Sequence, residues 1–373
     1  REKLKDEIKF WECVQFLFFT QWKKLKAYAN ENGIKIIGDI PIYVSSDSAD
    51  VWANPEQFQL DDNLMPISVA GCPPDMFSSY GQKWGNPIYD WKAMEKTDFA
   101  WWKKRMAASA RLYDVTRIDH FIGIVRYYNI PLDKDPIDGF YAEGPGIKLI
   151  KAIDSAMGDA KVIAEDLGVV VPEVTELIKK SGYPGMKVLQ FAFDGNGDNE
   201  HILHNHEKNY VAYLGTHDND TVVGYLENLN ERCQEYMMKY LHIPDMYSAA
   251  SALIRAAYGS VANTVIIQMQ DLLYKDSTAR MNTPSTLGIN WKWRMKDGEF
   301  TNELRDNLRE LTKLYGRSNI KKYFNKEDYM LSNICEKNYN KAIKDCTNEE
   351  IYFALLEMTK ELAKEKESNK GKK

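Results

Sequence analysis

The sequence lacks the features that would place the protein in a membrane or on nucleic acid. Its longest apolar run lies near residues 16–19, far short of the roughly 20 residues that a transmembrane helix needs. Basic residues are not in excess, because 49 Lys and Arg face 54 Asp and Glu and give a net charge of −5. Phosphate binding depends on such an excess. We therefore expect neither a membrane nor a nucleic-acid partner.

Cysteine is also scarce, and histidine forms no metal-binding pattern. The five cysteines are widely spaced, odd in number and without a CxxC pair, which is typical of reduced thiols in a cytoplasmic protein. The three histidines of segment 201–206 have no carboxylate or cysteine partner at ligand spacing, so we interpret this segment as a surface loop. We expect a cytoplasmic protein that uses no metal and no cofactor.

What is present is the composition of a globular protein, with 44% apolar and 28% charged residues. Apolar side chains between Phe10 and Ala29 recur at helical spacing, and Asn32-Gly33 supplies a stop signal. The β-branched run 34–40 follows directly. This order predicts a helix, a tight turn and a buried strand.

Apolar strand segments recur along the chain and alternate with helical patterns. Five more follow the first, at 114–118, 160–164, 186–193, 210–214 and 264–269. Such alternation predicts a parallel sheet covered on both faces. Polar or acidic residues gather just past the carboxyl end of each segment, which favours an α/β TIM (β/α)8 barrel over a doubly wound sheet. A closed barrel needs eight strands, so we predict an incomplete one.

Three carboxylates follow buried strand segments: Asp119, Glu165 and Asp218. Neighbouring acids force their pKa values apart, and one ionised and one protonated carboxyl group can cleave a glycosidic bond. Arg117 lies two residues before Asp119, on the same strand face, and can keep that carboxylate ionised. His217 beside Asp218 can grip sugar hydroxyls. Such acids can also merely cap helices, but three together with Arg117 and His217 favour catalysis.

Several segments also resemble one enzyme family. They are 38–44, 70–75, 81–87, 117–121, 164–168, 215–220, 279–284 and 290–294. In this order they are similar to segments of the 4-α-glucanotransferases, also called amylomaltases or disproportionating enzymes, which form glycoside hydrolase family seventy-seven of the α-amylase clan. The resemblance covers roughly residues 1–317. It implies transfer of α-1,4-glucan segments between maltodextrins by a retaining double displacement.

The resemblance assigns roles to matching positions. Asp119 would be the nucleophile, Glu165 the general acid/base and Asp218 the stabiliser of the transition state. Substrate-binding roles fall on Asp39, Arg117 and His217 around the sugar, on Gln82 and Trp84 on a mobile loop at the acceptor side, and on Asn282 after the last strand. Two alternatives stay open: a hydrolase of the same clan, and an inactive glucan-binding fragment.

The resemblance also implies a domain organisation. Asp39 would lie on the third barrel strand, so we expect residues 1–317 to hold strands 3–8 without the first two. The segment 45–110, rich in Trp, Pro and Gly, would be an inserted subdomain. Residues 318–373 have helical patterns and resemble the N-terminal leader of bacterial α-glucan phosphorylases, which implies a fused phosphorylase as a partner.

Overall fold

The structure is a computed structural model that describes residues 2–74, 79–168, 171–284, 286–318, 326–341 and 346–370. The chain divides into two compact units, Arg1–Arg294 and Met295–Lys373. Asp75 of the sequence segment 70–75 lies outside the described residues. So do parts of the segments 45–110 and 318–373 discussed above.

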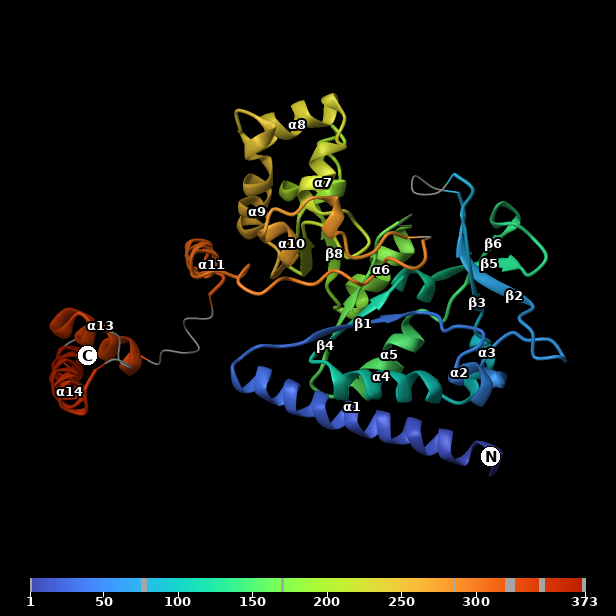
Figure 1. Cartoon of the computed structure of the whole chain (residues 1–373), viewed down its shortest axis with the longest axis horizontal. Coiled ribbons are helices and arrows are strands. Elements are labelled where there is room, and N and C mark those ends of the chain that lie inside the picture. Colours follow the sequence, from blue (N-terminus) through green and yellow to red (C-terminus); the bar gives the residue numbers. More distant parts are fainter. Residues whose placement is uncertain are drawn as a thin grey trace. The chain divides into compact units, whose positions relative to one another are not determined.

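In the described part of the first unit, six parallel strands form two three-stranded sheets. Figure 1 shows their arrangement. The first sheet has the order β1-β4-β7 and the second the order β10-β9-β8. Their bounds are β1 Ile37–Pro41, β4 Val115–Asp119, β7 Lys161–Ala164, β8 Gly185–Val188, β9 Tyr210–Tyr213 and β10 Thr264–Ile266. The N–H of Ala164 donates to the carbonyl of Pro184 over 2.9 Å and links the end of β7 to the segment that enters β8. The strands therefore follow one another in chain order.

The register of the first sheet decides which side chains meet. Asp39 of β1 pairs with Arg117 of β4, and Pro41 pairs with Asp119. Paired residues of a parallel sheet face the same side, and so do residues two apart on one strand. The side chains of Asp39, Arg117 and Asp119 therefore share one face, while Glu165 follows the end of β7 directly.

α-Helices separate the parallel strands except between β8 and β9, where the described chain forms only short 3-10 helices. The helix predicted before the first strand is α1 Lys5–Glu31, and Gly33 follows it with a left-handed φ of 72°. The Trp22 indole N–H donates to the carbonyl of Leu112 over 2.9 Å, so α1 lies against the end of α4 Ala100–Leu112. The other helices of this unit are α2 Ala49–Ala53, α3 Trp91–Lys96, α5 Ile147–Met157, α6 Pro172–Ser181, α7 Val222–Glu227, α8 Glu231–Leu241, α9 Ala249–Gly259 and α10 Met269–Leu272.

A separate antiparallel sheet has the order β3-β2-β5-β6. Its strands are β2 Ser68–Cys72, β3 Gln82–Pro87, β5 Arg126–Pro131 and β6 Phe140–Glu143. It therefore combines strands that precede β4 in the chain with strands that follow it. β5 and β6 were not among the strands predicted from the sequence. Because β3 carries both Gln82 and Trp84, this sheet positions two of the predicted site residues.

The main apolar core of the first unit lies between the β1–β4–β7 sheet and the helices that pack on it. Its largest fully buried side chains include Trp102, Tyr89, Phe121, Met94 and Met106. A second cluster, centred on Met186, Val188 and Val211, fills the space beside β8 and β9. Both clusters support the strands whose carboxyl ends carry the site.

The second unit is helical in the part that the structure describes. Its helices are α11 Asn302–Leu314, α13 Lys326–Tyr339 and α14 Asn348–Lys370. Ile334, Cys335 and Ala354 form a small apolar cluster between α13 and α14. Across the described residues of both units, no helix is long and apolar enough to cross a bilayer.

Candidate active site

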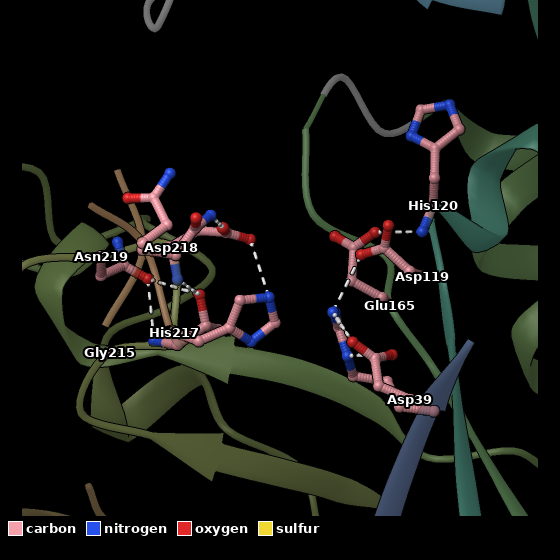
Figure 2. A network of polar contacts seen from close by, with 12 residues as sticks. Asp39, Asp119, His120, Glu165, Gly215, His217, Asp218 and Asn219 are labelled. Carbon is pink, nitrogen blue, oxygen red and sulfur yellow. Dashed lines mark hydrogen bonds and ion pairs between the residues drawn. The ribbon is translucent and has the colours of Figure 1, made fainter. Parts of the chain in front are cut away.

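A buried arginine of β4 bridges two carboxylates, that of Asp39 in the middle of β1 and that of Asp119 at the carboxyl end of β4. Both carboxylates are labelled in Figure 2. Nε and Nη2 of Arg117 donate to the two carboxylate oxygens of Asp39 over 2.9 and 2.8 Å, and Nη2 also donates to Oδ1 of Asp119 over 2.9 Å. Burial opposes the charge on Arg117, but the hydrogen bonds and charges of these carboxylates outweigh it and raise the pKa of the guanidinium. Arg117 therefore stays a cation that orients Asp119.

The pKa of Asp119 is raised above its ordinary value despite this partner. Burial raises the pKa of its carboxyl group, Arg117 lowers it, and the negative charges of Asp39 and Asp218 raise it again. The net shift is upward, so removing Arg117 would raise the pKa of Asp119 further. The guanidinium is thus the main group that favours the ionised form of Asp119.

Glu165 has the environment of a carboxylic acid that keeps its proton. Its side chain is buried, and burial together with the charge of Asp119 raises its pKa to about 8. The backbone N–H groups of His120 and Leu167 donate to its two oxygens over 2.6 and 2.9 Å and partly oppose this rise. At neutral pH the carboxyl group of Glu165 is mostly protonated, whereas Arg117 favours the ionised form of the adjacent Asp119.

A second cluster surrounds Asp218 on the loop that follows β9. One oxygen of Asp218 lies 3.2 Å from Nε2 of His217, and the other accepts a hydrogen bond from the Asn282 amide over 2.6 Å. Burial raises the pKa of Asp218, but these hydrogen bonds outweigh it and leave the pKa below its ordinary value. Burial lowers the pKa of His217, but the hydrogen bond and charge of Asp218 outweigh burial, so the pKa of His217 is raised overall. The cluster therefore combines an ionised carboxylate, Asp218, with two hydrogen-bond donors, His217 and Asn282.

The two clusters belong to one site. Figure 2 shows Asp119 and Glu165 on one side and His217 with Asp218 on the other, facing the same space. The negative charge of Asp218 raises the pKa of Asp119, and His217 lowers it. The site thus combines an acid, an adjacent carboxylate and a set of polar groups that can bind hydroxyls.

The remaining two predicted residues lie on β3 beside this site. The indole N–H of Trp84 donates to Oε1 of Gln82 over 3.0 Å, and the Trp84 ring meets the His120 ring edge to face with centroids 4.9 Å apart. Tyr43 lies on another side of Trp84, with ring centroids 6.3 Å apart. An aromatic wall therefore connects β3 to the end of β4.

Comparison with known proteins identifies the family. The sequence profile described as 4-alpha-glucanotransferase matches residues 1–301. The chain belongs to this family. It is 48% identical over 320 residues to a 4-alpha-glucanotransferase of Clostridium butyricum, covering 85% of this chain and 66% of the relative. For a Streptococcus pneumoniae 4-alpha-glucanotransferase, the identity is 46% and the coverage is 86% of this chain and 64% of the relative. The chain thus spans about two thirds of the length of these relatives.

Solved structures agree with this family assignment. An amylomaltase from Streptococcus agalactiae, solved in complex with acarbose, superposes with a TM-score of 0.82 at 42% identity, covering 85% of this chain and 64% of that one. An amylomaltase from Corynebacterium glutamicum has a TM-score of 0.67 at 20% identity, which shows a shared fold. The chain therefore has the α/β, TIM-barrel-like fold of the 4-alpha-glucanotransferase family.

Some supporting residues in this family member escaped the sequence analysis. Arg280 donates to the carbonyls of Asp218 and Asn282 over 2.5 and 2.8 Å, and so ties the loop after β9 to the loop after β10. The Gln268 amide donates to the carbonyls of Gly215 and Thr216 over 3.1 and 3.0 Å. Gln268 lies within the predicted strand segment 264–269, whereas the observed strand β10 already ends at Ile266. The sequence therefore contained no sign that the Gln268 side chain stands past the strand.

The interpretation of segment 201–206 as a surface loop is wrong for its last histidine. His206 is buried, and its Nε2 lies 2.9 Å from the carbonyl of His201. Nδ1 of His201 accepts a hydrogen bond from the N–H of Val188 over 3.2 Å. The His201 ring thus attaches the segment to the end of β8, and the His206 ring binds back to His201 within the segment. Among the described residues, no group of His, Cys, Asp or Glu side chains is arranged to hold a metal ion.

Proposed function

We propose that this protein is a 4-α-glucanotransferase that passes α-1,4-glucan segments from one maltodextrin to another. The observation that carries the proposal is the adjacent pair Asp119 and Glu165, one held by an arginine and the other protonated at neutral pH. Such a pair suits a retaining reaction, which needs a nucleophile and an acid at the same bond. The relatives that bear the name 4-alpha-glucanotransferase support the substrate class.

The first step forms a covalent intermediate. A carboxylate oxygen of Asp119 attacks the anomeric carbon while Glu165 gives its proton to the leaving 4-oxygen, so that the glycosidic bond breaks and a β-linked glucosyl ester forms. In the second step, Glu165 takes the proton of an acceptor 4-hydroxyl, whose oxygen displaces Asp119 and restores an α-1,4 bond. No net proton is gained or lost over the two steps.

The neighbouring residues take positioning and binding roles in this proposal. Arg117 orients Asp119, and Asp39 holds the other side of the guanidinium. His217, Asp218 and Asn282 would bind hydroxyls of the sugar at the cleavage site, where hydrogen bonds that strengthen in the transition state lower the barrier. Gln82 and Trp84, on β3 at the edge of the site, would line the acceptor side.

We also propose a finer fold assignment. The six parallel strands would be strands 3–8 of a (β/α)8 barrel within a catalytic domain of residues 1–317, with 45–110 as its main insertion. Their strand order and the link between β7 and β8 support this assignment. Residues 318–373 would form the helical leader of a fused phosphorylase, and the protein would be cytoplasmic. The coding sequence around this segment tests the fusion.

Incubation of the chain with maltotriose as the only sugar tests the function. We expect glucose together with a ladder of dextrins longer than maltotriose, because the enzyme-bound glucan passes to a sugar 4-hydroxyl. Chromatography of the products over time provides the measurement. Glucose and maltose alone would indicate a hydrolase that uses water, and unconsumed maltotriose would contradict both activities.

Substitution of Arg117 by Gln should shift the pH profile. Asp119 must be ionised to attack, and Arg117 lowers its pKa, so the variant should need a higher pH. We expect the acidic limb of kcat/KM to rise by about 1–3 pH units and kcat to fall by about tenfold or more. The control is Arg111→Gln at an exposed position of α4. An unchanged acidic limb would argue against this role of Arg117.

A further inference from the structure

His120 has a backbone conformation that its side chain does not favour. It lies in the left-handed region, with φ 55° and ψ 47°, directly after the nucleophile and before a short 3-10 helix Phe121–Ile124. Residues other than glycine adopt this region at a cost, and histidine, asparagine and aspartate tolerate it better than β-branched residues. Such strain persists only where the surrounding structure maintains it, and it gathers at functional sites.

This conformation directs the backbone of His120 at Glu165. The His120 N–H donates to Oε2 of Glu165 over 2.6 Å, as Figure 2 shows, while its ring points away from the carboxyl group. The next residue, Phe121, donates its N–H to the Glu165 carbonyl over 3.0 Å, and the Glu165 N–H donates to Ile118 over 3.1 Å. Residues 118–121 therefore form hydrogen bonds both with the backbone of Glu165 and with one of its side-chain oxygens.

The His120 ring is held from the other side by aromatic and backbone groups. Its edge-to-face contact with Trp84 has centroids 4.9 Å apart. A Cβ at Gly123 would lie 3.3 Å from Cδ2 of His120, so the ring packs closely over this glycine. Burial lowers the pKa of His120 to about 4, which leaves the ring neutral at working pH. The ring is thus an uncharged aromatic part of the wall next to β3.

We propose that His120 is a positioning residue that couples Trp84 of β3 to the carboxyl group of Glu165 through its left-handed backbone. The contact of Trp84 with the ring keeps the backbone turned, and the turned backbone places a donor on Oε2. The inference rests on the proposed function, because it concerns the acid/base role of Glu165. Through this coupling, the hydrogen bond to Glu165 depends on β3, the strand that would line the acceptor side.

The test measures the pKa of Glu165 directly. The full chain is labelled with ¹³C at the glutamate carboxyl carbons, the Glu165 signal is assigned with Glu165→Gln, and the titration is followed by NMR. His120→Asn removes the ring but tolerates the left-handed region, whereas His120→Val does not. An N–H donor favours the ionised form, so its displacement in His120→Val should raise the pKa of Glu165 by about one unit relative to His120→Asn.

A matched control separates this effect from general strain. His242 has nearly the same φ, 54°, at the exposed C-terminal end of α8, away from the site. His242→Val should leave the Glu165 titration unchanged. Trp84→Ala should raise the pKa of Glu165 in the wild-type background and add nothing in the His120→Val background, since coupled residues are not additive. If His120→Val fails to fold, His120→Ala takes its place.

Two results of the titration would overturn the inference. One is the same Glu165 pKa in wild type, His120→Asn and His120→Val; the other is an equal effect of Trp84→Ala in both backgrounds. Because the titration needs no turnover, it is independent of the maltotriose assay. Where the chain is active, the alkaline limb of kcat/KM should move upward with the measured pKa. A fall in activity without that movement would also count against the coupling.

Discussion

Asp119→Asn should lower the rate of transfer from maltotriose by about 10⁴-fold or more, which corresponds to about 5 kcal/mol of transition-state stabilisation. The amide has nearly the shape of the carboxylate, and its oxygen can still accept the hydrogen bond that Arg117 gives to Oδ1. It cannot form the glucosyl ester, so both steps of the double displacement lose their nucleophile. Initial rates measured from product chromatography test this prediction.

The fold should not suffer from the same substitution. The pKa of Asp119 is raised in the folded protein, mainly by burial. A carboxyl group with a raised pKa stabilises the folded state at low pH and loses this contribution as pH rises. At neutral pH the ionised group therefore lowers the stability of the folded state. Asp119→Asn should therefore melt at the same temperature or slightly higher. The control Asp62→Asn, at an exposed position, should change neither property. Normal transfer by Asp119→Asn would disprove the nucleophile assignment.

The parallel strands were readable from the sequence because each is a short apolar run that ends at a polar residue. Asp119 and Glu165 were found in this way, and Arg117 was matched to Asp119 by the two-residue period of a strand. The run 186–193 was predicted too long, since the chain leaves the strand after Val188 and enters a 3-10 helix over Leu189–Phe191. Periodicity cannot separate a buried strand from a buried helical turn in so short a run.

Pairing between segments far apart in the chain could not be predicted from the sequence. The two hydrogen bonds from Arg117 to Asp39 depend on the register of β1 against β4, which lie far apart in the chain. Likewise, β5 exists because β2 pairs with it, and its residues, Arg126–Pro131, have no clear alternation of their own. The backbone donors to Glu165, from His120 and Leu167, leave no trace in side-chain identity. Such features arise from tertiary structure alone.

Glu165→Gln should remove the alkaline limb of the pH profile together with most of the activity. Glu165 must be protonated to assist the leaving group, and its pKa of about 8 means that kcat/KM of the wild type falls as pH rises beyond that value. Loss of a general acid typically costs about 10²–10⁴-fold. An α-glucosyl fluoride needs no proton on its leaving group, so formation of the glucosyl ester from it should be largely spared.

The stability of the folded chain gives an independent measure of the same group. Glu165 has a pKa raised from 4.5 to about 8 by burial and by Asp119, so the folded state binds a proton that the unfolded state releases. Stability should therefore decrease as pH rises from about 4.5 to about 8, by about 2–3 kcal/mol between pH 5 and pH 7. Urea unfolding of wild type and Glu165→Gln across this range isolates the contribution.

In Glu165→Gln this part of the pH dependence should disappear, because the amide neither binds nor releases a proton, whereas the exposed Glu143→Gln should retain it. The two measurements on Glu165 constrain each other. A kinetic limb near pH 8 without the matching loss of stability would assign the limb to another group. The stability change without the limb would leave Glu165 a buried acid that takes no part in the reaction. Only both together support the acid/base role, since one protonation equilibrium must then govern folding and catalysis alike.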